Sequence, residues 1–200
     1  MNTTKAFFDA RAGIWDEITM YNCSADDFRR LVSMVEAGRG KNVVDLGCGT
    51  GVLTPYIIEA VGSEGEVFAV DISGEMLKML AKKHSNANIR PLAVSAERMR
   101  QIPAEAADAA ICFCAFPHFE DKDAAMSEIS RVTKRGGKLL ISHLESREDL
   151  NKFHECMEEP ICNHSLPDYD EMSGLLLKHG FKVLHYLNDK GRYELLAQRQ

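Results

Sequence analysis

Three alternating glycines directly follow a short hydrophobic stretch of the chain. Gly47, Gly49 and Gly51 come after the apolar run 43–46, and a helical pattern begins immediately beyond them. That pattern consists of four apolar residues at helical spacing: Leu53, Ile57, Ile58 and Val61. Glycine has no Cβ and accepts unusual dihedral angles, so a ligand can lie directly against the backbone. Unpaired N–H groups at the helix start favour electron-rich ligand atoms. The run therefore predicts a strand–loop–helix turn that binds a small cofactor.

Strand and helix patterns alternate through most of the chain. Strands are predicted at 42–46, 66–71, 88–94, 108–114 and 137–143, helices near 52–62, 74–84 and 121–134, and a short turn near 97–101. Such alternation is typical of a parallel sheet with helices on both faces. A helix near 168–179 and two strands at 181–187 and 192–198, joined by a short polar loop, predict a closing antiparallel hairpin. We expect a doubly wound, Rossmann-like α/β fold with a seven-stranded, mostly parallel sheet.

The first 40 residues are predicted to be helical. Apolar residues at 28, 31, 32 and 35 repeat at helical spacing after Ser24, a candidate N-cap. Aromatic and aliphatic residues at 7, 8, 14, 15 and 18 predict a second amphipathic element that packs as a lid. We expect one domain over 1–200, with a helical lid (1–40), a cofactor-binding core (41–143), and a substrate-side segment with the closing hairpin (144–200).

Composition and charge narrow the class of partner. The net charge is −6 and no block of Lys and Arg is present, which disfavours nucleic acid as a partner. The apolar runs are of strand length and the first residues lack a hydrophobic signal core, so we expect neither a membrane span nor export, and a cytoplasmic location. Six cysteines form no Cys-x-x-Cys pair, which favours a reduced state.

The spacing of the glycines distinguishes between two kinds of cofactor. A dinucleotide fingerprint would need glycine at position 52, where this chain has Val52. Asp71 ends the next predicted strand, 20 residues beyond Gly51, where a carboxylate can accept both hydroxyls of a ribose. Asp71 could instead cap the following helix, although Ser73 suits that role better. The pattern thus favours a ribose-containing ligand other than a dinucleotide.

Residues 45–51 together with Asp71 resemble the signature of class I S-adenosylmethionine-dependent methyltransferases. More narrowly, the chain resembles the small group, methyltransferase 11-like, that includes the ubiquinone/menaquinone-biosynthesis C-methyltransferases. Further matches are Phe7-Phe8-Asp9, Trp15-Asp16, Asp108-Ala109-Ala110-Ile111, Arg131-Val132 and Gly136-Gly137-Lys138-Leu139. The resemblance covers about residues 5–145 and implies S-adenosylmethionine as the cofactor.

The same resemblance implies a set of cofactor contacts. Gly47, Cys48, Gly49 and Gly51 would lie against the methionine and ribose parts, with Asp45 ordering the loop. Asp71 would bind the ribose hydroxyls, and the adenine would lie between Ile72 and Met76. The adenine amino group would face Ser95, Ala96 and Glu97, with Ser95 where the family often has an acidic residue. Cys112 and Cys114 would border the methyl donor.

Methyl transfer from a sulfonium is a direct displacement, so it needs alignment and exclusion of water more than a nucleophilic side chain. A general base is needed only if the acceptor must lose a proton. Ligands of open α/β sheets lie beyond the carboxyl ends of the strands. This rule points to His118 and His143 as candidate catalytic residues. His118 could instead only hydrogen-bond its loop or cap the helix near Asp121.

The stretch 143–170 is the least similar to the family. It contains His154, Cys156, Cys162 and His164, whose side chains are of the kinds that zinc and copper prefer. Their spacing matches no common zinc module, so no metal site is predicted, and an inserted segment over the site is the simpler interpretation. The alternative is a metal- or thiol-containing substrate bound by these residues.

The leading hypothesis is therefore an enzyme that methylates a small molecule. A non-catalytic S-adenosylmethionine-binding regulatory module and a nicotinamide-dependent oxidoreductase are the alternatives from other classes. The sequence leaves open the acceptor, the atom that is methylated and the oligomeric state.

Overall fold

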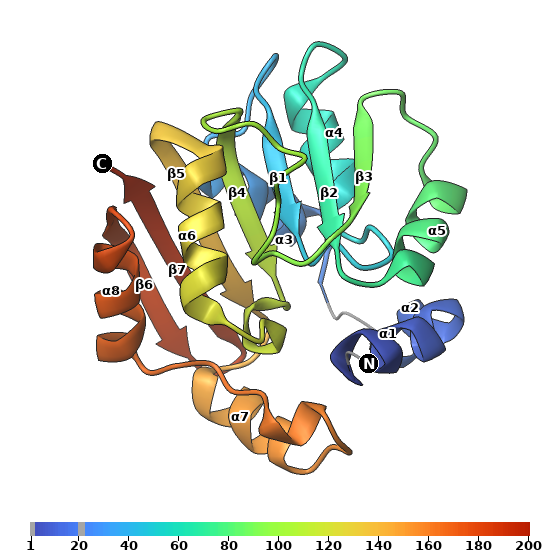
Figure 1. The fold of residues 1–200 in the computed structure, drawn as a ribbon, viewed down its shortest axis with the longest axis vertical. Coiled ribbons are helices and arrows are strands. Elements are labelled where there is room, and N and C mark those ends of the chain that lie inside the picture. The colour runs from blue at the N-terminus through green and yellow to red at the C-terminus, as the bar shows by residue number, and fades with distance from the viewer. Residues whose placement is uncertain (1–2, 20–22) are drawn as a thin grey trace.

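The computed structural model describes residues 3–19 and 23–200. Its centre is a seven-stranded sheet with the order β3-β2-β1-β4-β5-β7-β6 (Figure 1). The strands are β1 (Val43–Leu46), β2 (Val67–Asp71), β3 (Ile89–Ala93), β4 (Ala107–Phe113), β5 (Thr133–His143), β6 (Phe181–Asp189) and β7 (Arg192–Arg199). The first five are parallel, and β7 pairs antiparallel with both β5 and β6. The predicted fold class is confirmed.

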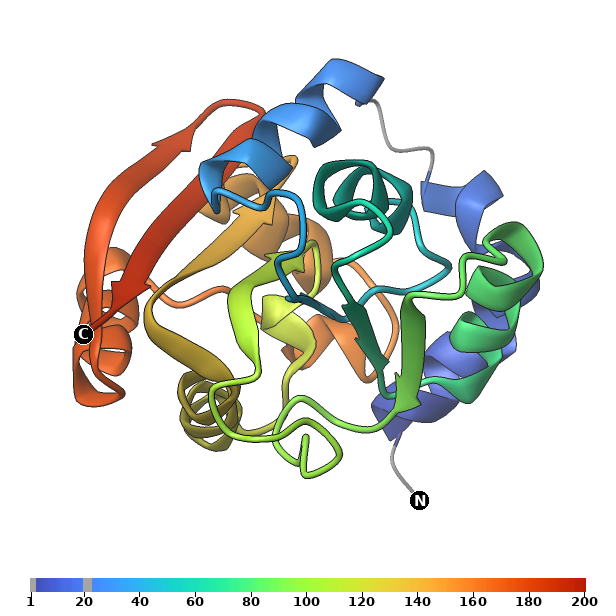
Figure 2. The same cartoon turned by 90° about the horizontal axis from the view of Figure 1, so that it is seen from above.

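Helices cover both faces of this sheet (Figure 2). One face carries α3 (Ala25–Met34), α4 (Thr54–Val61) and α5 (Gly74–Lys83), and the other carries α6 (Lys122–Val132) and α8 (Tyr169–Lys178). Three short helices, α1 (Thr3–Arg11), α2 (Trp15–Thr19) and α7 (Arg147–Glu155), lie beyond the carboxyl ends of the parallel strands (Figure 1). No helix in the described ranges is long and apolar enough to cross a membrane.

Burial on both faces explains why the central strands are continuously apolar. Val43 packs with α3 and α4, whereas its neighbour Val44 packs with α6 on the opposite face. Successive side chains of a strand point to opposite faces, so a strand covered on both sides is apolar at most positions. Asp45 is the one polar residue of β1, and it is buried. Burial of a carboxyl group does not stabilise an apolar core, which indicates a functional role for Asp45.

The predicted N-terminal elements agree with the described helices. Ser24 caps α3 in a capping box with Asp27, as the sequence predicts. Residues 1–2 and 20–22 of the segment predicted to be helical lie outside the described residues.

Two elements differ from the prediction. Strand β5 begins at Thr133, four residues before the predicted start, because Thr133 pairs with Ala107 and the register then shifts, so that Lys138 pairs with Ala109. Helix α7 was not predicted; its Ser146 N-cap accepts the Asp149 N–H, and few of its side chains are buried. The turn between β3 and β4 is present without helical structure.

Candidate functional site

The glycine loop turns sharply between β1 and α4. Gly47 and Gly49 have φ angles of +65° and +55°, a region that side chains disfavour. The N–H groups of Gly47 and Cys48 both donate to the carbonyl of Val70, at 2.8 and 3.0 Å, which ties the loop to β2. A Cβ on Gly47 would lie 2.4 Å from the Cβ of Ala115, so the loop and the segment after β4 touch only because position 47 is glycine.

This contact gives a direct prediction for stability. Gly47→Ala is expected to lower the free energy of unfolding by about 3 kcal/mol, with about 1 kcal/mol from the left-handed backbone and about 2 kcal/mol from overpacking against Ala115. Gly136 has a φ of +78° with open space around its Cα, so Gly136→Ala is the matched control and should cost only about 1 kcal/mol. Urea unfolding of both variants measures the difference. Equal losses would show that the contact with Ala115 is unimportant.

Two buried carboxyl groups lie at the base of the loop. Asp71 accepts the N–H of Gly49 and the N–H of Ser73, each at 2.8 Å. Asp45 accepts the hydroxyl of Thr54 at 2.8 Å. Burial raises the pKa of Asp71 to about 6 and that of Asp45 to about 7, with Asp71 adding repulsion to Asp45. Both carboxylates thus favour a ligand that brings hydroxyl donors and positive charge.

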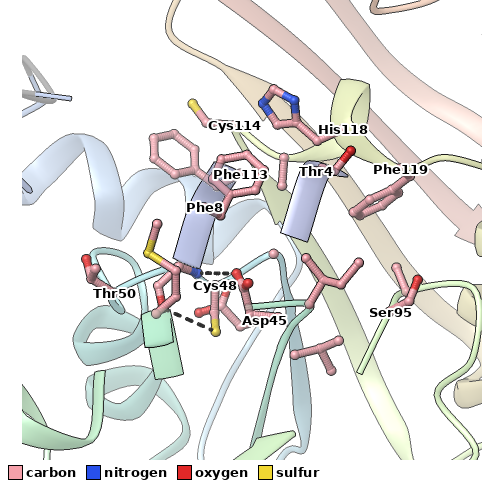
Figure 3. Close-up of a pocket in the computed structure, with 18 of the residues that line it drawn as sticks. Thr4, Phe8, Asp45, Cys48, Thr50, Ser95, Phe113, Cys114, His118 and Phe119 are labelled. Atoms are coloured by element: carbon pink, nitrogen blue, oxygen red, sulfur yellow. Dashed lines mark hydrogen bonds between the residues drawn. The ribbon is translucent and has the colours of Figure 1, made fainter. Parts of the chain in front are cut away.

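The pocket above these carboxyl groups contains most of the predicted cofactor residues. The predicted residues that line it are Asp45, Gly47, Cys48, Gly49, Asp71, Ile72, Met76, Ser95, Ala96, Glu97 and Cys114. In Figure 3, Phe8, His118 and Thr4 lie opposite Asp45 and Cys48 across the pocket. A ribose over Asp71, an adenine beside Ile72 and Met76, and a cationic group near Asp45 fit this arrangement.

Two predicted cofactor residues lie elsewhere. Gly51 packs against α5, where a Cβ would approach Leu80 and His84 to 3.0 Å, so this glycine serves helix packing rather than the pocket lining. Cys112 is fully buried in the core formed with α6, because strand alternation turns it away from the pocket that Phe113 lines.

The N-terminal helices are hydrogen-bonded to the glycine loop and to the N-cap of α5. Asp16 of α2 accepts the hydroxyl of Thr50, and Asp9 of α1 accepts the hydroxyl of Ser73 at 2.6 Å. Phe8 and Trp15, from the same segment, line the pocket. The N-terminal segment thus contributes two aromatic side chains to the pocket wall.

A second, wider cavity of about 670 Å³ adjoins the first. Four residues line both cavities: Phe8, Trp15, Cys114 and His118. The far wall is formed by the end of β5 and by α7, including His143, Leu150, Phe153 and His154. The two cavities therefore meet at His118 and Cys114, just after β4.

Three histidines from separate segments meet at this junction. Nδ1 of His118 lies 2.9 Å from Nδ1 of His164, and Nδ1 of His154 lies 2.8 Å from the backbone oxygen of His164. Burial is the largest of the effects that lower the pKa of each ring, so all three rings are neutral at neutral pH. The cap of α6 is Asp121, which accepts the Ala124 N–H, so His118 does not cap that helix.

His143 lies deeper in the second cavity, at the end of β5. Its Nε2 atom is buried and makes no hydrogen bond within the described part of the chain. Burial lowers its pKa to about 3, so this ring is neutral and offers an unused polar atom.

His154, Cys156, Cys162 and His164 do not form one cluster. His154 and His164 come together, but Cys156 is exposed and Cys162 is only partly buried. Across residues 3–19 and 23–200, no three His, Cys, Asp or Glu side chains are grouped to hold a metal ion.

Sequence reasoning missed the polar end of the second cavity. Arg30 of α3 donates to buried Glu194 of β7 through both terminal nitrogens, at 3.1 and 2.5 Å. The sequence signal was a charged residue within the otherwise apolar run 193–197, since Glu194 stands between Tyr193 and Leu195.

Comparisons with known proteins identify the family. A methyltransferase domain family matches residues 37–191. The ubiquinone/menaquinone biosynthesis C-methyltransferase UbiE of Shewanella sp. (strain W3-18-1) is 29% identical over 188 residues, covering 80% of this chain and 74% of that protein.

Solved structures share the fold at low identity. A SAM-dependent methyltransferase from Aquifex aeolicus matches with a TM-score of 0.71 and 21% identity, over 87% of this chain and 90% of that one. The methyltransferase in complex with the Haloferax volcanii Trm112 activator gives a TM-score of 0.81 and 17% identity, over 96% of each chain. The chain therefore belongs to the methyltransferase domain family and is a class I S-adenosylmethionine-dependent methyltransferase.

Proposed function

We propose that this enzyme methylates a small-molecule acceptor bound in the second cavity, with His118 as the general base. The observation that carries the proposal is the junction at which Cys114 and His118 line both cavities. An acceptor in the wider cavity would approach the donor at this junction, where the two cavities adjoin. Residues 41–143 would hold the donor, while 1–40 and 144–200 would supply the acceptor side.

The bound donor supplies its methyl group as an electrophile on sulfur. Asp71 and the glycine loop hold the donor, and Phe8 and Trp15 keep water from the reacting atoms. Formation of the bond between the acceptor atom and the methyl carbon would break the carbon–sulfur bond, and sulfur would keep the electron pair. The acceptor's proton passes to Nε2 of His118, because Nδ1 is occupied by His164.

The charge of the second cavity favours a neutral acceptor. Arg11, Arg30 and Arg192 are matched by Asp27, Glu145 and Glu194 among its lining residues. The remaining lining is rich in aromatic and apolar side chains, and His143 offers an unused nitrogen for one polar group. The UbiE relatives are named as C-methyltransferases of quinone biosynthesis. We therefore propose a quinol-type ring, methylated at carbon, as the acceptor.

Binding and turnover assays test this function in turn. Calorimetry with S-adenosylmethionine, S-adenosylhomocysteine and NAD should show binding of the first two. Release of S-adenosylhomocysteine is then followed with short-chain quinols, a catechol, an amine and a thiol. Turnover with quinols alone supports the proposal. Turnover only with the amine or thiol contradicts the acceptor class, and donor binding without any turnover indicates a regulatory module.

Asp71→Ala is expected to weaken S-adenosylmethionine binding at least tenfold. The variant removes two charge-assisted hydrogen bonds to the ribose, and tenfold corresponds to about 1.4 kcal/mol. Isothermal titration calorimetry measures the change, and urea unfolding checks that the loop bonded to Asp71 still folds. An unchanged dissociation constant would rule out the ribose contact.

A further inference from the structure

A histidine that acts as a base through Nε2 must carry its proton on Nδ1. Only then does Nε2 have the free electron pair that removes the acceptor's proton. Nδ1 of His118 faces Nδ1 of His164 at 2.9 Å, so one of these nitrogens donates and the other accepts. Which of them donates therefore decides whether His118 can be the base.

The surroundings of His164 keep its ring neutral and so allow it to accept this hydrogen bond. The ring must be neutral to accept, and burial, Lys122 and His154 all lower its pKa. Lys122 itself donates to the carbonyl groups of Pro117 and Phe119, at 3.1 and 3.2 Å. The other groups that face His118 are Phe8 of α1, at a ring-centroid distance of 5.2 Å, and neutral His143. None of these groups adds a negative charge that would favour a protonated His164.

The backbone of His164 is held in place by a second histidine. Nδ1 of His154 on α7 lies 2.8 Å from the carbonyl oxygen of His164, which can only accept, so Nδ1 of His154 carries its proton. The ring centroids of His154 and His164 are each 5.1 Å from that of His118. The segment between α7 and α8 is thereby fastened over the junction of the two cavities.

We propose that His164 is a positioning residue that accepts the Nδ1–H of His118 and thereby leaves Nε2 of His118 free to act as the base. His154 fixes His164 through its backbone. The inference rests on the proposed function, because it assigns the tautomer that a base at position 118 requires. When His118 takes the acceptor's proton at Nε2, its Nδ1–H bond to His164 is retained, so the ring does not reorient during the reaction.

The tautomer can be measured without any acceptor. Nitrogen-15 NMR of the imidazole rings, in the full chain with bound S-adenosylhomocysteine, should show His118 protonated at Nδ1 and unprotonated at Nε2. His164→Asn should preserve this tautomer, because the amide oxygen can accept the same hydrogen bond. His164→Leu should shift His118 toward the form protonated at Nε2. A proton on Nε2 in the unmodified enzyme, or an unaltered spectrum in His164→Leu, would overturn the proposal.

Kinetics separate positioning from a structural role. His164→Leu should lower kcat about tenfold or more with KM and donor affinity unchanged, whereas His164→Asn should recover most of kcat. His179→Leu is the matched control, because His179 bonds to Asp123 away from both cavities and should leave kcat unchanged. Equal losses in the Asn and Leu variants would contradict positioning.

Two results separate this inference from its competitors. If the unmodified enzyme transfers no methyl group to any acceptor, the proposed function fails, and the NMR spectrum still decides the tautomer. A stoichiometric bound metal ion, whose removal by a chelator shifts the resonances of all three rings, would overturn the inference, because the metal would occupy the nitrogens.

Discussion

Replacing His118 with asparagine is expected to lower kcat by about 10²-fold or more, the usual contribution of a positioned general base. His118 lies where the two cavities meet, and its Nδ1 atom lies 2.9 Å from Nδ1 of His164. Donor affinity should change little, because the glycine loop and Asp71 make the expected donor contacts. Steady-state kinetics and calorimetry measure the two quantities separately.

The pH profile provides a second check on the same residue. Burial and the neighbouring histidines hold the pKa of His118 well below its usual value. A base is active when deprotonated, so this lowering keeps His118 active to more acidic pH than a free histidine would be. We expect no loss of kcat attributable to His118 between pH 8 and its ordinary pKa of about 6.5. Full activity in His118→Asn would remove this residue from the reaction.

The residues that line the first pocket were predictable because their signals are local. Gly47 directly follows β1, Asp71 is the last residue of β2, and residues 95–97 come shortly after β3. The carboxyl ends of parallel strands converge at one edge of a sheet. Position 51 was the exception within the loop: its spacing matched a ligand contact, but the structure uses it to let α5 approach. Spacing alone does not distinguish these two uses of glycine.

The second cavity was less predictable because its contacts join distant segments. His118 and His164 are 46 residues apart in sequence, and neither belongs to a periodic pattern. The segment 143–170 was interpreted as an inserted segment over the site, yet its helix α7 was missed, because only Leu150 and His154 are buried along it. Ser146 followed by Asp149 was the available signal, since this spacing is typical of a helix start.

Affinity for S-adenosylmethionine is expected to rise as the pH increases from about 5 to about 8. In the free enzyme the pKa is about 6 for Asp71 and about 7 for Asp45. The ribose hydroxyls and the positive charge of the donor favour the carboxylate forms, so binding lowers both pKa values and releases protons. Each proton released allows up to about a tenfold gain in affinity per pH unit, and the affinity becomes constant above about pH 8. Calorimetry in buffers of different ionisation enthalpy counts the protons.

Asp45→Asn tests the origin of this dependence and links it to stability. The variant should bind the donor more weakly. Its affinity should lose the part of the pH dependence near pH 7, while the part due to Asp71 near pH 6 remains.

In the free enzyme Asp45 has a folded pKa above its unfolded value, so its contribution to stability falls as the pH rises from about 4 to 7. At pH 8 Asp45→Asn should therefore be more stable than the unmodified enzyme, by up to about 4 kcal/mol at roughly 1.4 kcal/mol per pKa unit. If Asp45→Asn were instead less stable than the unmodified enzyme at pH 8, the prediction would be wrong. The buried carboxylate of Asp45 would then stabilise the free enzyme.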